Sequence, residues 1–588
     1  MVTKQILGTV DYIVICVSLL ISISIGIVSR KYAGQQKTAK EYILAGRRMT
    51  KLPVVLSVVV TLVSPSTLLS TPVEVYLYGY ELSLAPLTFP IGMFLASWIF
   101  IPVYFRCGVS TIYEFLEIRY GKMIRYIIST LFLVQMIFYM VISLYGAVLA
   151  LSAVTDLSLE ISLVSLGAIC TFYSSLGGLR AVLWTDVFQA ALITICVISL
   201  YVVGFKDGGG FVNVYNNAKG GGRLEFFDFR LDFTKRHDIW ACMIRGILYA
   251  IAFYGTNQVE VQRVLSLSTA ERARSTLHLT ILPASAIFFL THIYGIVLYS
   301  VYYHCDPILN VNQTGLSRYD QIVPAYIVNR FNSIPGLTGV CIAGIFSASL
   351  STMSSCLNSA STVTVIDFIK PFYKKGTLSD LKTVFLVKLF SVIYGGVCIG
   401  LSFCFLEVKS LVQLLNIMLT SLEGPMLAVF LTGVLTRKAS DKCVSFSLVT
   451  SYLVMSWIGF GTLLSGYVKS PLPLSTDECP SNNVSLTSSF NFTSALKISS
   501  STQIPEESTF VLYRISFMWY ALMGFLLTQF LIILSVLVTG WKNNVIPKDS
   551  ICLSPVTRFW LNRANLDKPL EMKQGKETND IIPSTSQM

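Results

Sequence analysis

The sequence predicts an all-helical protein that crosses a lipid bilayer about thirteen times. Of its 588 residues, 53% are hydrophobic and only 13% are charged, which is roughly half the charged fraction of an average soluble protein. The hydrophobic residues form long blocks, at least a dozen of them near 20 residues. This is the length at which a helix crosses a hydrocarbon core of ~30 Å. The fold class is therefore an all-α polytopic membrane protein.

Polar breaks divide the apolar blocks into individual spans. Each block is long enough to form one membrane helix. The thirteen expected spans lie near residues 10–28, 53–79, 85–105, 126–153, 159–175, 184–205, 239–259, 277–303, 335–364, 383–404, 409–436, 443–466 and 509–540.

The distribution of basic residues gives the expected orientation. The loop after the first span, "RKYAGQQKTAKEYILAGRRMTK", has seven Lys or Arg and one acidic residue, and basic loops stay in the cytoplasm. Thirteen crossings then put the N-terminus outside the cell and the C-terminal tail inside, in a protein expected at the plasma membrane. This alternation accounts for the net charge of +12 without a nucleic-acid partner.

Several residues in the loops assigned to the exterior agree with this orientation. The acceptor sequences for N-glycosylation at Asn312, Asn483 and Asn491 all fall there. Cys305 and Cys479 also lie outside, where either a disulfide or a chance coincidence would explain them. The tail is expected to be disordered, and its last residues, "SQM", weakly resemble a ligand for PDZ domains.

The second span interrupts itself with the stretch "LVSPSTLLSTP". Pro65 lacks an amide donor and disturbs the carbonyls one turn earlier. The carbonyl oxygens of Val60 and Val63 would then be free to hold a small cation beside the nearby hydroxyl groups. The alternative is an ordinary proline kink whose carbonyls are satisfied by neighbouring serines.

The ninth span is unusually polar for a membrane helix. Between Ser347 and Ser361 it has seven serines, one threonine and one asparagine in fifteen residues. Small polar faces often only let helices pack closely. A sodium ion, however, prefers hard oxygen ligands, and this helix together with the interrupted second span could supply them.

The order of the spans suggests an internal repeat. Spans two to six and spans seven to eleven form two five-helix units of opposite orientation, as in many secondary transporters. The counterpart of span two is then span seven, which is interrupted by Gly255, Thr256, Asn257 and Gln258. A pair of interrupted helices in corresponding positions points to a binding site near the membrane midplane, and this favours the ion-binding interpretation over the kink.

Two motifs identify a family resemblance. The stretches "YSSLGGLRAVLWTDVFQ" and "FSASLSTMSSCLNSASTVTVIDF" resemble the sodium:solute symporter family over nearly the whole chain, from residue 8 to about 545. "TPVEVYLYG", "STIYEFLEIRYGK" and "YGTNQVEVQRVLS" resemble the branch that transports monocarboxylates, multivitamins and iodide. The resemblance implies a leucine-transporter-type fold, a 5+5 inverted repeat with one extra N-terminal and two extra C-terminal helices.

This fold implies a division of the chain into six parts. They are an N-terminal helix and basic loop (1–52), repeat one (53–206), an extracellular loop (207–238), repeat two (239–436), two C-terminal helices with a glycosylated loop (437–540) and a cytoplasmic tail (541–588).

The resemblance also implies which residues bind sodium. Sodium would lie between the second and ninth spans, and Asp186 and Gln189 match positions tied to sodium coupling in relatives. Thr61 and Gln258 match positions that can serve a further sodium. An alternative for Asp186 is an acidic group that stabilises a helix N-terminus. The matching sodium ligands are the carbonyls of Val60, Val63 and Ala348 and the hydroxyls of Ser351 and Thr352.

The solute is expected above the sodium, between the two breaks and the fourth span. No Arg or Lys is expected at mid-depth there, so an anionic solute would rely on hydroxyl groups, amides, helix N-termini and the bound sodium. Core packing is the alternative role for each aromatic residue. The candidates are Ser66, Thr67, Tyr139, Tyr145, Phe253, Asn257 and Gln413.

Three residues depart from the pattern of the resembling branch. Pro65 stands where relatives usually have a small residue, and Thr67 stands where iodide-type members have glutamine. Glu423 places a carboxylate inside a span, where such a group is expensive and often functional. Glu423 is expected to bind a cation, carry a proton or disfavour anions, and these differences argue against iodide.

The predicted function is sodium-coupled import of a small organic anion, a monocarboxylate or a vitamin such as biotin or pantothenate, by alternating access. The alternatives are another small solute (iodide, choline or a sugar), or a non-transporting sensor or channel on the same scaffold. An enzyme is not expected, because the chain has no metal motif, paired acids or activated nucleophile, and no phosphate-binding GxxxxGK[ST] loop suggests an ATP-driven pump.

Overall fold

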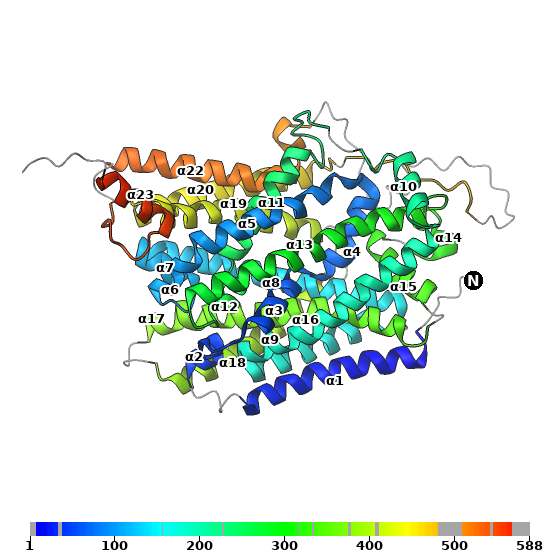
Figure 1. Ribbon diagram of the computed structural model, residues 1–588, viewed down its shortest axis with the longest axis horizontal. Coiled ribbons are helices and arrows are strands. Elements are labelled where there is room, and N and C mark those ends of the chain that lie inside the picture. The colour runs from blue at the N-terminus through cyan, green and yellow to red at the C-terminus, as the bar shows by residue number, and fades with distance from the viewer. Residues whose placement is uncertain are drawn as a thin grey trace, which may run out of the picture.

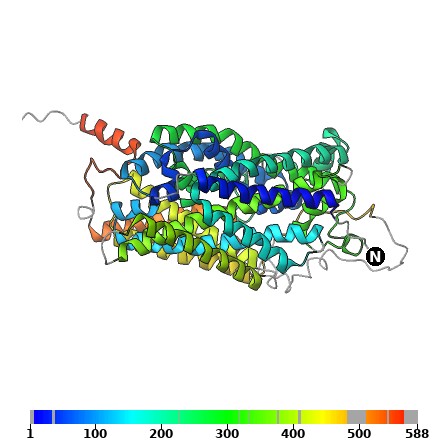
Figure 2. The same cartoon turned by 90° about the horizontal axis from the view of Figure 1, so that it is seen from below.

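The computed structural model is a bundle of long helices that run side by side (Figures 1 and 2). It describes residues 7–32, 38–155, 157–225, 228–316, 318–331, 334–373, 378–405, 411–467, 469–479, 509–540 and 545–566. Within these ranges the only extended pairing is an isolated bridge between Lys438 and Val545. The predicted all-α class is confirmed.

The described residues form long helices at the positions of the expected spans, with short helices between them. They are α1 (Thr9–Tyr32), α2 (Ala39–Leu44), α3 (Lys51–Leu62), α4 (Pro65–Tyr78), α5 (Leu84–Ile99), α6 (Ile101–Cys107), α7 (Ile112–Arg119), α8 (Lys122–Val154), α9 (Leu159–Asp207), α10 (Phe211–Gly220), α11 (Ile239–Gly255), α12 (Gln258–Val264), α13 (Ala270–Val301), α14 (Val311–Thr314), α15 (Ile322–Phe331), α16 (Leu337–Val363), α17 (Lys370–Phe372), α18 (Asp380–Phe405), α19 (Leu411–Leu435), α20 (Asp441–Leu464), α22 (Tyr520–Thr539) and α23 (Pro555–Leu566).

The number of membrane spans agrees with the prediction. Ten helices in the described ranges are long and apolar enough to cross a membrane, and the bent pairs α3–α4 and α11–α12 raise the number to twelve. One of the ten, α9, has 49 residues and would be about 70 Å long if it were straight. It is interrupted at Gly178 and corresponds to two predicted spans, which accounts for thirteen.

The last span begins later than expected. The sequence predicts it from residue 509, whereas α22 begins at Tyr520. The preceding segment forms two short 3₁₀ turns. It is tied down by Ser516, whose amide donates to the carbonyl of Phe233 at 2.9 Å and whose hydroxyl donates to the carbonyl of Arg236 at 2.7 Å.

The serine-rich helix α16 has the most buried of the membrane-spanning stretches in the described residues. In the best membrane-spanning stretch of α16 and its continuation, 94% of residues are buried, compared with 28% for α1 and 28% for α22. The serines of α16 therefore face protein and not lipid, because a polar side chain in hydrocarbon without a partner is costly. The candidate site described below therefore includes hydroxyl and carbonyl groups of α16.

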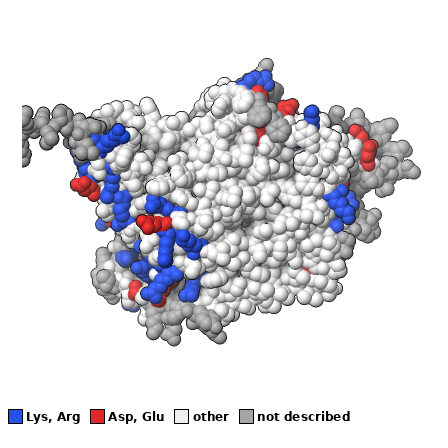
Figure 3. All heavy atoms as spheres, viewed as in Figure 1, with Lys and Arg blue, Asp and Glu red and all other residues white. Residues whose placement is uncertain are grey.

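The two ends of the bundle differ in charge. Most of the Lys and Arg atoms visible in Figure 3 gather at one end, where Figure 1 shows α2, α6, α7, α17 and α23. We call this the basic end. The opposite end has α10, α14 and α15, and Asn312 lies there in α14. Asn483, Asn491 and the C-terminal "SQM" lie outside the described residues.

A disulfide joins Cys305 to Cys479, with their Cα atoms 5.0 Å apart. Of the two interpretations that the sequence left open, the structure has the disulfide. The bond connects the segment after α13 to residues 469–479, and Leu472 of that segment donates its amide to the carbonyl of Leu77 at 2.9 Å. These contacts fasten the loop over the end of α4.

Gly178 makes the break in α9 possible. Its φ of 58° and ψ of −162° lie in a region that is open essentially only to glycine. A Cβ atom at this position would stand 2.8 Å from the carbonyl oxygen of Tyr42. The hydroxyl of Tyr42 donates to the carbonyl of Ser175 at 2.9 Å, so α2 packs directly on the break.

We expect Gly178→Ala to destabilise the protein by about 2 kcal/mol, because strained backbone conformations of this kind cost of order 1–3 kcal/mol. Thermal unfolding of the purified protein in detergent measures the effect. Gly396→Ala in α18 is the matched control, because Gly396 is exposed and a Cβ there meets no atom within 4 Å. Equal melting temperatures for the two variants would contradict the assigned break.

Candidate functional site

The first candidate element is the break between α3 and α4, whose axes differ by 48°. Val63 leaves the helical conformation, and its amide donates to the carbonyl of Val60 at 2.9 Å. Ser64 then caps α4 in a reciprocal arrangement with Thr67. Pro65 occupies the first helical position, where its missing donor costs nothing. The chain therefore starts a new helix at Pro65 and does not kink a continuous one.

The second element is the break between α11 and α12, with a 60° change of direction. It falls within the four residues predicted from the sequence. Asn257 caps α12 by accepting a hydrogen bond from the amide of Val259 at 2.9 Å. The carbonyl of Gly255 accepts a hydrogen bond of 2.5 Å from the hydroxyl of Tyr104. Both helices thus restart with a side-chain cap, which satisfies backbone amides that would otherwise be unpaired in a membrane.

Asp186 connects the first broken helix to α16. Its side chain is fully buried, and one carboxylate oxygen accepts a hydrogen bond of 2.5 Å from Ser57 of α3. The other oxygen accepts one of 2.7 Å from Ser351 of α16. Asp186 lies two turns beyond the Gly178 break, whereas the dipole effect falls off within the first turn. The helix N-terminus interpretation does not fit this position.

Arg263 joins α12 to the same cluster. Its Nε donates to the hydroxyl of Ser57 at 2.8 Å, and Nη2 lies 3.6 Å from Asp186 and donates to Ser355. Nη1 donates to Glu260 at 2.8 Å. Arg263 is only 1% exposed. One guanidinium group therefore ties α12 to α3, α9 and α16.

Arg263, Glu260 and Ser57 are absent from the set of residues predicted from the sequence. Arg263 follows the second break closely and belongs to a stretch that the positive-inside pattern assigns to a basic loop. Asp186 itself could have indicated that a basic partner is nearby, because a carboxylate inside a span needs a paired charge or several hydrogen-bond donors. The nearest basic residue after either break is Arg263.

The predicted sodium ligands lie next to this cluster. Thr61 follows Ser57 by one turn of α3 and donates to its carbonyl at 2.7 Å. Thr352 follows Ser351 directly and donates to the carbonyl of Ala348 at 2.9 Å. Asp186 holds Ser57 and Ser351 together, so neighbouring turns of α3 and α16 present these oxygens at one level. The hydroxyls of Ser351 and Thr352 act as donors in these bonds, so their oxygens keep a lone pair for an ion.

The donor set suits a hard cation. The described residues include no group of three or more His, Cys, Asp or Glu side chains that could hold a metal ion. The candidate ligands Val60, Val63, Ala348, Ser351 and Thr352 instead offer neutral carbonyl and hydroxyl oxygens, which are hard donors.

The two predicted glutamines behave differently. Gln189 is fully buried, and neither atom of its amide has a hydrogen-bond partner. Gln258 is occupied elsewhere, since its oxygen accepts from the amide of Ile112 at 2.9 Å and its nitrogen donates to the carbonyl of Ser110 at 3.2 Å. Gln189 therefore has free polar atoms for an ion, while Gln258 holds the loop before α7.

Comparison with known proteins identifies the family of this chain. The model of the family described as "Sodium:solute symporter family" matches residues 42–447. The chain belongs to the sodium:solute symporter family. The resemblance seen in the sequence is confirmed, and the protein is a sodium-coupled symporter in a membrane.

Relatives of this symporter match over most of its length. A Drosophila melanogaster protein provisionally named as a sodium-dependent multivitamin transporter is 35% identical over 545 residues, which is 92% of this chain and 88% of that protein. The human sodium-coupled monocarboxylate transporter 1 is 33% identical over 547 residues, with the same coverage of both chains. A Na⁺-coupled sialic acid symporter, solved in a substrate-bound outward-open state, has the same fold with a TM-score of 0.73 at 20% identity, over 90% of this chain and 98% of that one.

The predicted solute residues of the symporter fall around the two breaks. The hydroxyls of Ser64 and Ser66 are 2.7 Å apart, and Tyr139 of α8 lies beside Ser64. On α11 the ring of Phe253 lies 5.4 Å from that of Tyr249.

Two further predicted solute residues make other contacts, and the side chain of a third lies outside the described residues. The side-chain oxygen of Asn257 is used in capping α12. Tyr145 accepts a hydrogen bond of 3.2 Å from Arg318. The side chain of Gln413 lies outside the described residues.

One basic side chain lies inside the second broken helix. The absence of Arg and Lys at mid-depth around the breaks stays a prediction, because Arg245 of α11 lies ten residues before Gly255. Its Nη2 is 3.6 Å from Glu423 of α19. The pair is hard to foresee because Arg245 stands alone in an apolar span and its acidic partner Glu423 is distant in the sequence.

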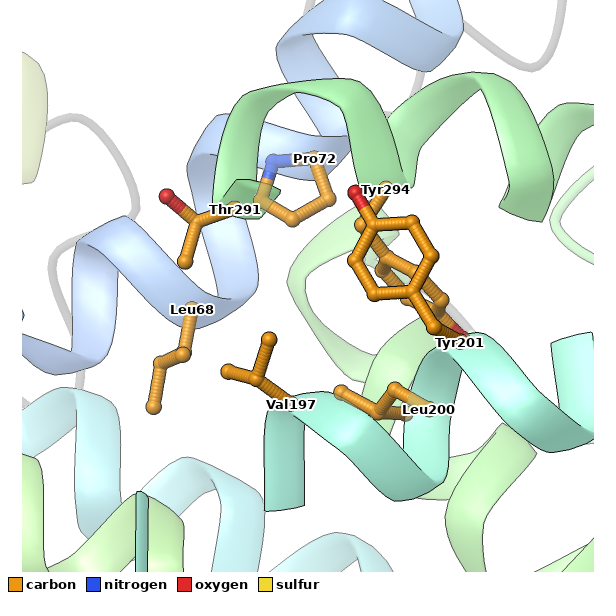
Figure 4. Close-up of a pocket in the computed structure, with 7 residues that line it drawn as sticks. All are labelled: Leu68, Pro72, Val197, Leu200, Tyr201, Thr291 and Tyr294. Atoms are coloured by element: carbon orange, nitrogen blue, oxygen red, sulfur yellow. The ribbon is translucent and has the colours of Figure 1, made fainter. Parts of the chain in front are cut away.

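A small pocket lies on another side of α4 (Figure 4). Leu68 and Pro72 of α4, Val197 of α9 and Tyr294 of α13 are among its lining residues. The lining is almost entirely apolar and includes none of the predicted sodium or solute residues. We therefore place the candidate site at the breaks and not in this pocket.

We expect Arg263→Met to destabilise the symporter by about 3–5 kcal/mol, because it leaves a buried carboxylate without its partner. The double variant Arg263→Met with Asp186→Asn should recover part of this loss. Thermal unfolding in detergent gives both values. Arg330→Met is the control, because Arg330 is 56% exposed in its pair with Asp207 and exposed pairs contribute below about 1 kcal/mol. A double variant no more stable than the single one would contradict the assigned pairing.

Proposed function

We propose that this symporter imports a small organic anion, a monocarboxylate or a vitamin such as biotin or pantothenate, together with sodium. The names of the relatives in the monocarboxylate and multivitamin branch support the substrate class. The observation that carries the proposal is the Asp186 cluster, which links both broken helices to the hydroxyl-rich α16. In this proposal the basic end is cytoplasmic and the N-terminus is outside the plasma membrane.

Sodium would bind first, between α3 and α16. Its ligands would be the carbonyls of Val60, Val63 and Ala348 and the hydroxyls of Ser351 and Thr352. Binding draws α3 toward α16 and so sets the position of the α4 N-terminus, where Ser64 and Ser66 face the solute. Sodium would therefore bind before the solute, because the ion fixes the α4 N-terminus against which the solute packs.

Contacts at the basic end would open when the solute is released. The hydroxyl of Thr111 donates to Asp367 at 2.8 Å, and Arg125 pairs with the same carboxylate. The neighbouring amide of Ile112 bonds Gln258 of α12. This loop therefore joins α12, α8 and the continuation of α16, and an inward-open state requires that it separate from α12.

The membrane voltage supplies part of the driving force. One charge that moves through 100 mV releases about 2.3 kcal/mol, so two sodium ions release about 4.6 kcal/mol. This corresponds to about three decades of accumulation for a neutral solute. Each negative charge on the solute subtracts about 2.3 kcal/mol. Transport is electrogenic whenever the sodium charges outnumber those of the solute.

Sodium-evoked currents in oocytes test the substrate class. Lactate, nicotinate, biotin, pantothenate, iodide and glucose are offered separately, with sodium and with choline in its place. We expect a saturable inward current for an organic anion, lost in choline. A current only for iodide or glucose, or none for any solute with surface expression confirmed, would contradict the proposal.

Thr352→Ala should raise the sodium concentration for half-maximal transport about tenfold, the factor that corresponds to one lost polar contact. The sodium dependence of tracer uptake measures this. Ser361→Ala is the matched control on the same helix, because the Ser361 hydroxyl donates to the carbonyl of Leu357 in its own helix. An unchanged sodium dependence in Thr352→Ala would contradict the sodium assignment.

A further inference from the structure

Arg245 and Glu423 form an incomplete ion pair inside the bundle. The closest nitrogen–oxygen distance is 3.6 Å, and the two side chains are 17% and 14% exposed. Nη1 of Arg245 and Oε1 of Glu423 are buried and have no hydrogen-bond partner. Each residue thus keeps one buried polar atom that the structure leaves unsatisfied.

This arrangement is a poor way to hold two helices together. A nitrogen–oxygen distance of 3.6 Å is beyond hydrogen-bond range, and a buried pair is favourable only when its remaining donors and acceptors are satisfied. An unsatisfied buried polar group costs about 1–3 kcal/mol. Arg263 offers the contrast within the same protein, because hydrogen bonds engage all three of its nitrogens. The open atoms of Arg245 and Glu423 therefore need a partner that is bound in another state.

The pair lies in line with the solute region. Tyr249 follows Arg245 by one turn of α11, and the guanidinium carbon lies 6.0 Å from its ring centroid. Phe253 comes one turn later with its ring 5.4 Å from that of Tyr249. Tyr139 and Glu423 also lie near Tyr249. A continuous row of side chains thus leads from Arg245 to the break at the end of α11, about 15 Å along the helix.

We propose that Arg245 and Glu423 form a second polar element of the solute site, in which Arg245 binds the carboxylate of the solute and Glu423 accepts a hydrogen bond from a donor group on the same molecule. The inference rests on the proposed function and narrows its substrate class. The guanidinium fork matches a carboxylate, and an ionised carboxylate only accepts hydrogen bonds.

The proposal selects carboxylates that have a hydroxyl or ammonium group on the neighbouring carbon. A bare carboxylate at Arg245 would approach the negative charge of Glu423 without any compensating contact. A solute that also donates to Glu423 turns this repulsion into a hydrogen bond. Because the two residues form one pair, the carboxylate and the donor must lie close together in the solute.

Three solutes of nearly equal size separate these cases: butyrate, 2-hydroxybutyrate and 2-aminobutyrate. Sodium-dependent uptake of each is measured in cells that express the full-length symporter. We expect a KM about tenfold lower for at least one of the two donor-bearing solutes than for butyrate, the factor for one hydrogen bond to a charged group. The comparison between hydroxyl and ammonium identifies the donor.

Glu423→Gln tests the role of the carboxylate without a large change of shape. It should reduce the KM ratio between butyrate and the preferred solute to below about threefold, while butyrate is still transported. Arg245→Lys should raise the KM for all the carboxylates together. Arg330→Gln is the control, since this exposed arginine pairs with Asp207 at 3.3 Å away from the solute region, and it should leave the ratio unchanged.

Two results would overturn this inference and leave the proposed function standing. They are a wild-type KM for butyrate within twofold of the other two, and a ratio that Glu423→Gln leaves unchanged. In the second case the pair only joins α11 to α19. No sodium-dependent uptake of any carboxylate by the wild type at the cell surface would instead overturn the proposed function, and this inference with it.

Discussion

The structure depends on a carboxylate that has no access to water. Asp186 lies in the membrane interior, where an unpaired charge would cost several kcal/mol, and every group that compensates it comes from a different helix. Ser57 brings α3, Ser351 brings α16 and Arg263 brings α12. The positions of the two broken helices relative to α16 therefore follow from the need to satisfy this one side chain.

The same constraint links ion binding to the geometry of the breaks. With both carboxylates ionised, Asp186 and Glu260 have one negative charge more than Arg263 can neutralise. Glu260 also has a buried oxygen without a hydrogen-bond partner. A cation among the neighbouring oxygens of α3 and α16 would balance this excess. Neutral ligands close to a net negative cluster suit a sodium ion that must bind and leave, because they hold it less tightly than direct carboxylates would.

The sequence was sufficient for the spans and for both breaks. Apolar length, a proline at a helix start and four polar residues after Gly255 have local consequences, so these features could be predicted. Arg263 and Arg245 could not, because their partners are distant in the sequence and a basic residue near a span end usually indicates a loop. The break at Gly178 falls between the predicted spans 159–175 and 184–205, so the sequence located the interruption, while the φ of Gly178 is known only from the structure. The predicted sodium ligands remain predictions, although the structure places their helices around Asp186.

The two buried arginines show how completeness of pairing separates structural roles from binding roles. Arg263 has a partner for each nitrogen, so a ligand would gain nothing by approaching it. Arg245 and Glu423 keep one open atom each, so a solute that satisfies both atoms gains two contacts in a region of low dielectric. The charge of that solute also matters for transport. A carboxylate solute with an ammonium group has no net charge, so a two-sodium cycle at 100 mV keeps the full ~4.6 kcal/mol for accumulation. A hydroxy acid has one negative charge, and its entry against the voltage uses about half of that energy. The chemistry of the Arg245–Glu423 pair therefore bears on how steeply the symporter can concentrate its solute, as well as on which solute it accepts.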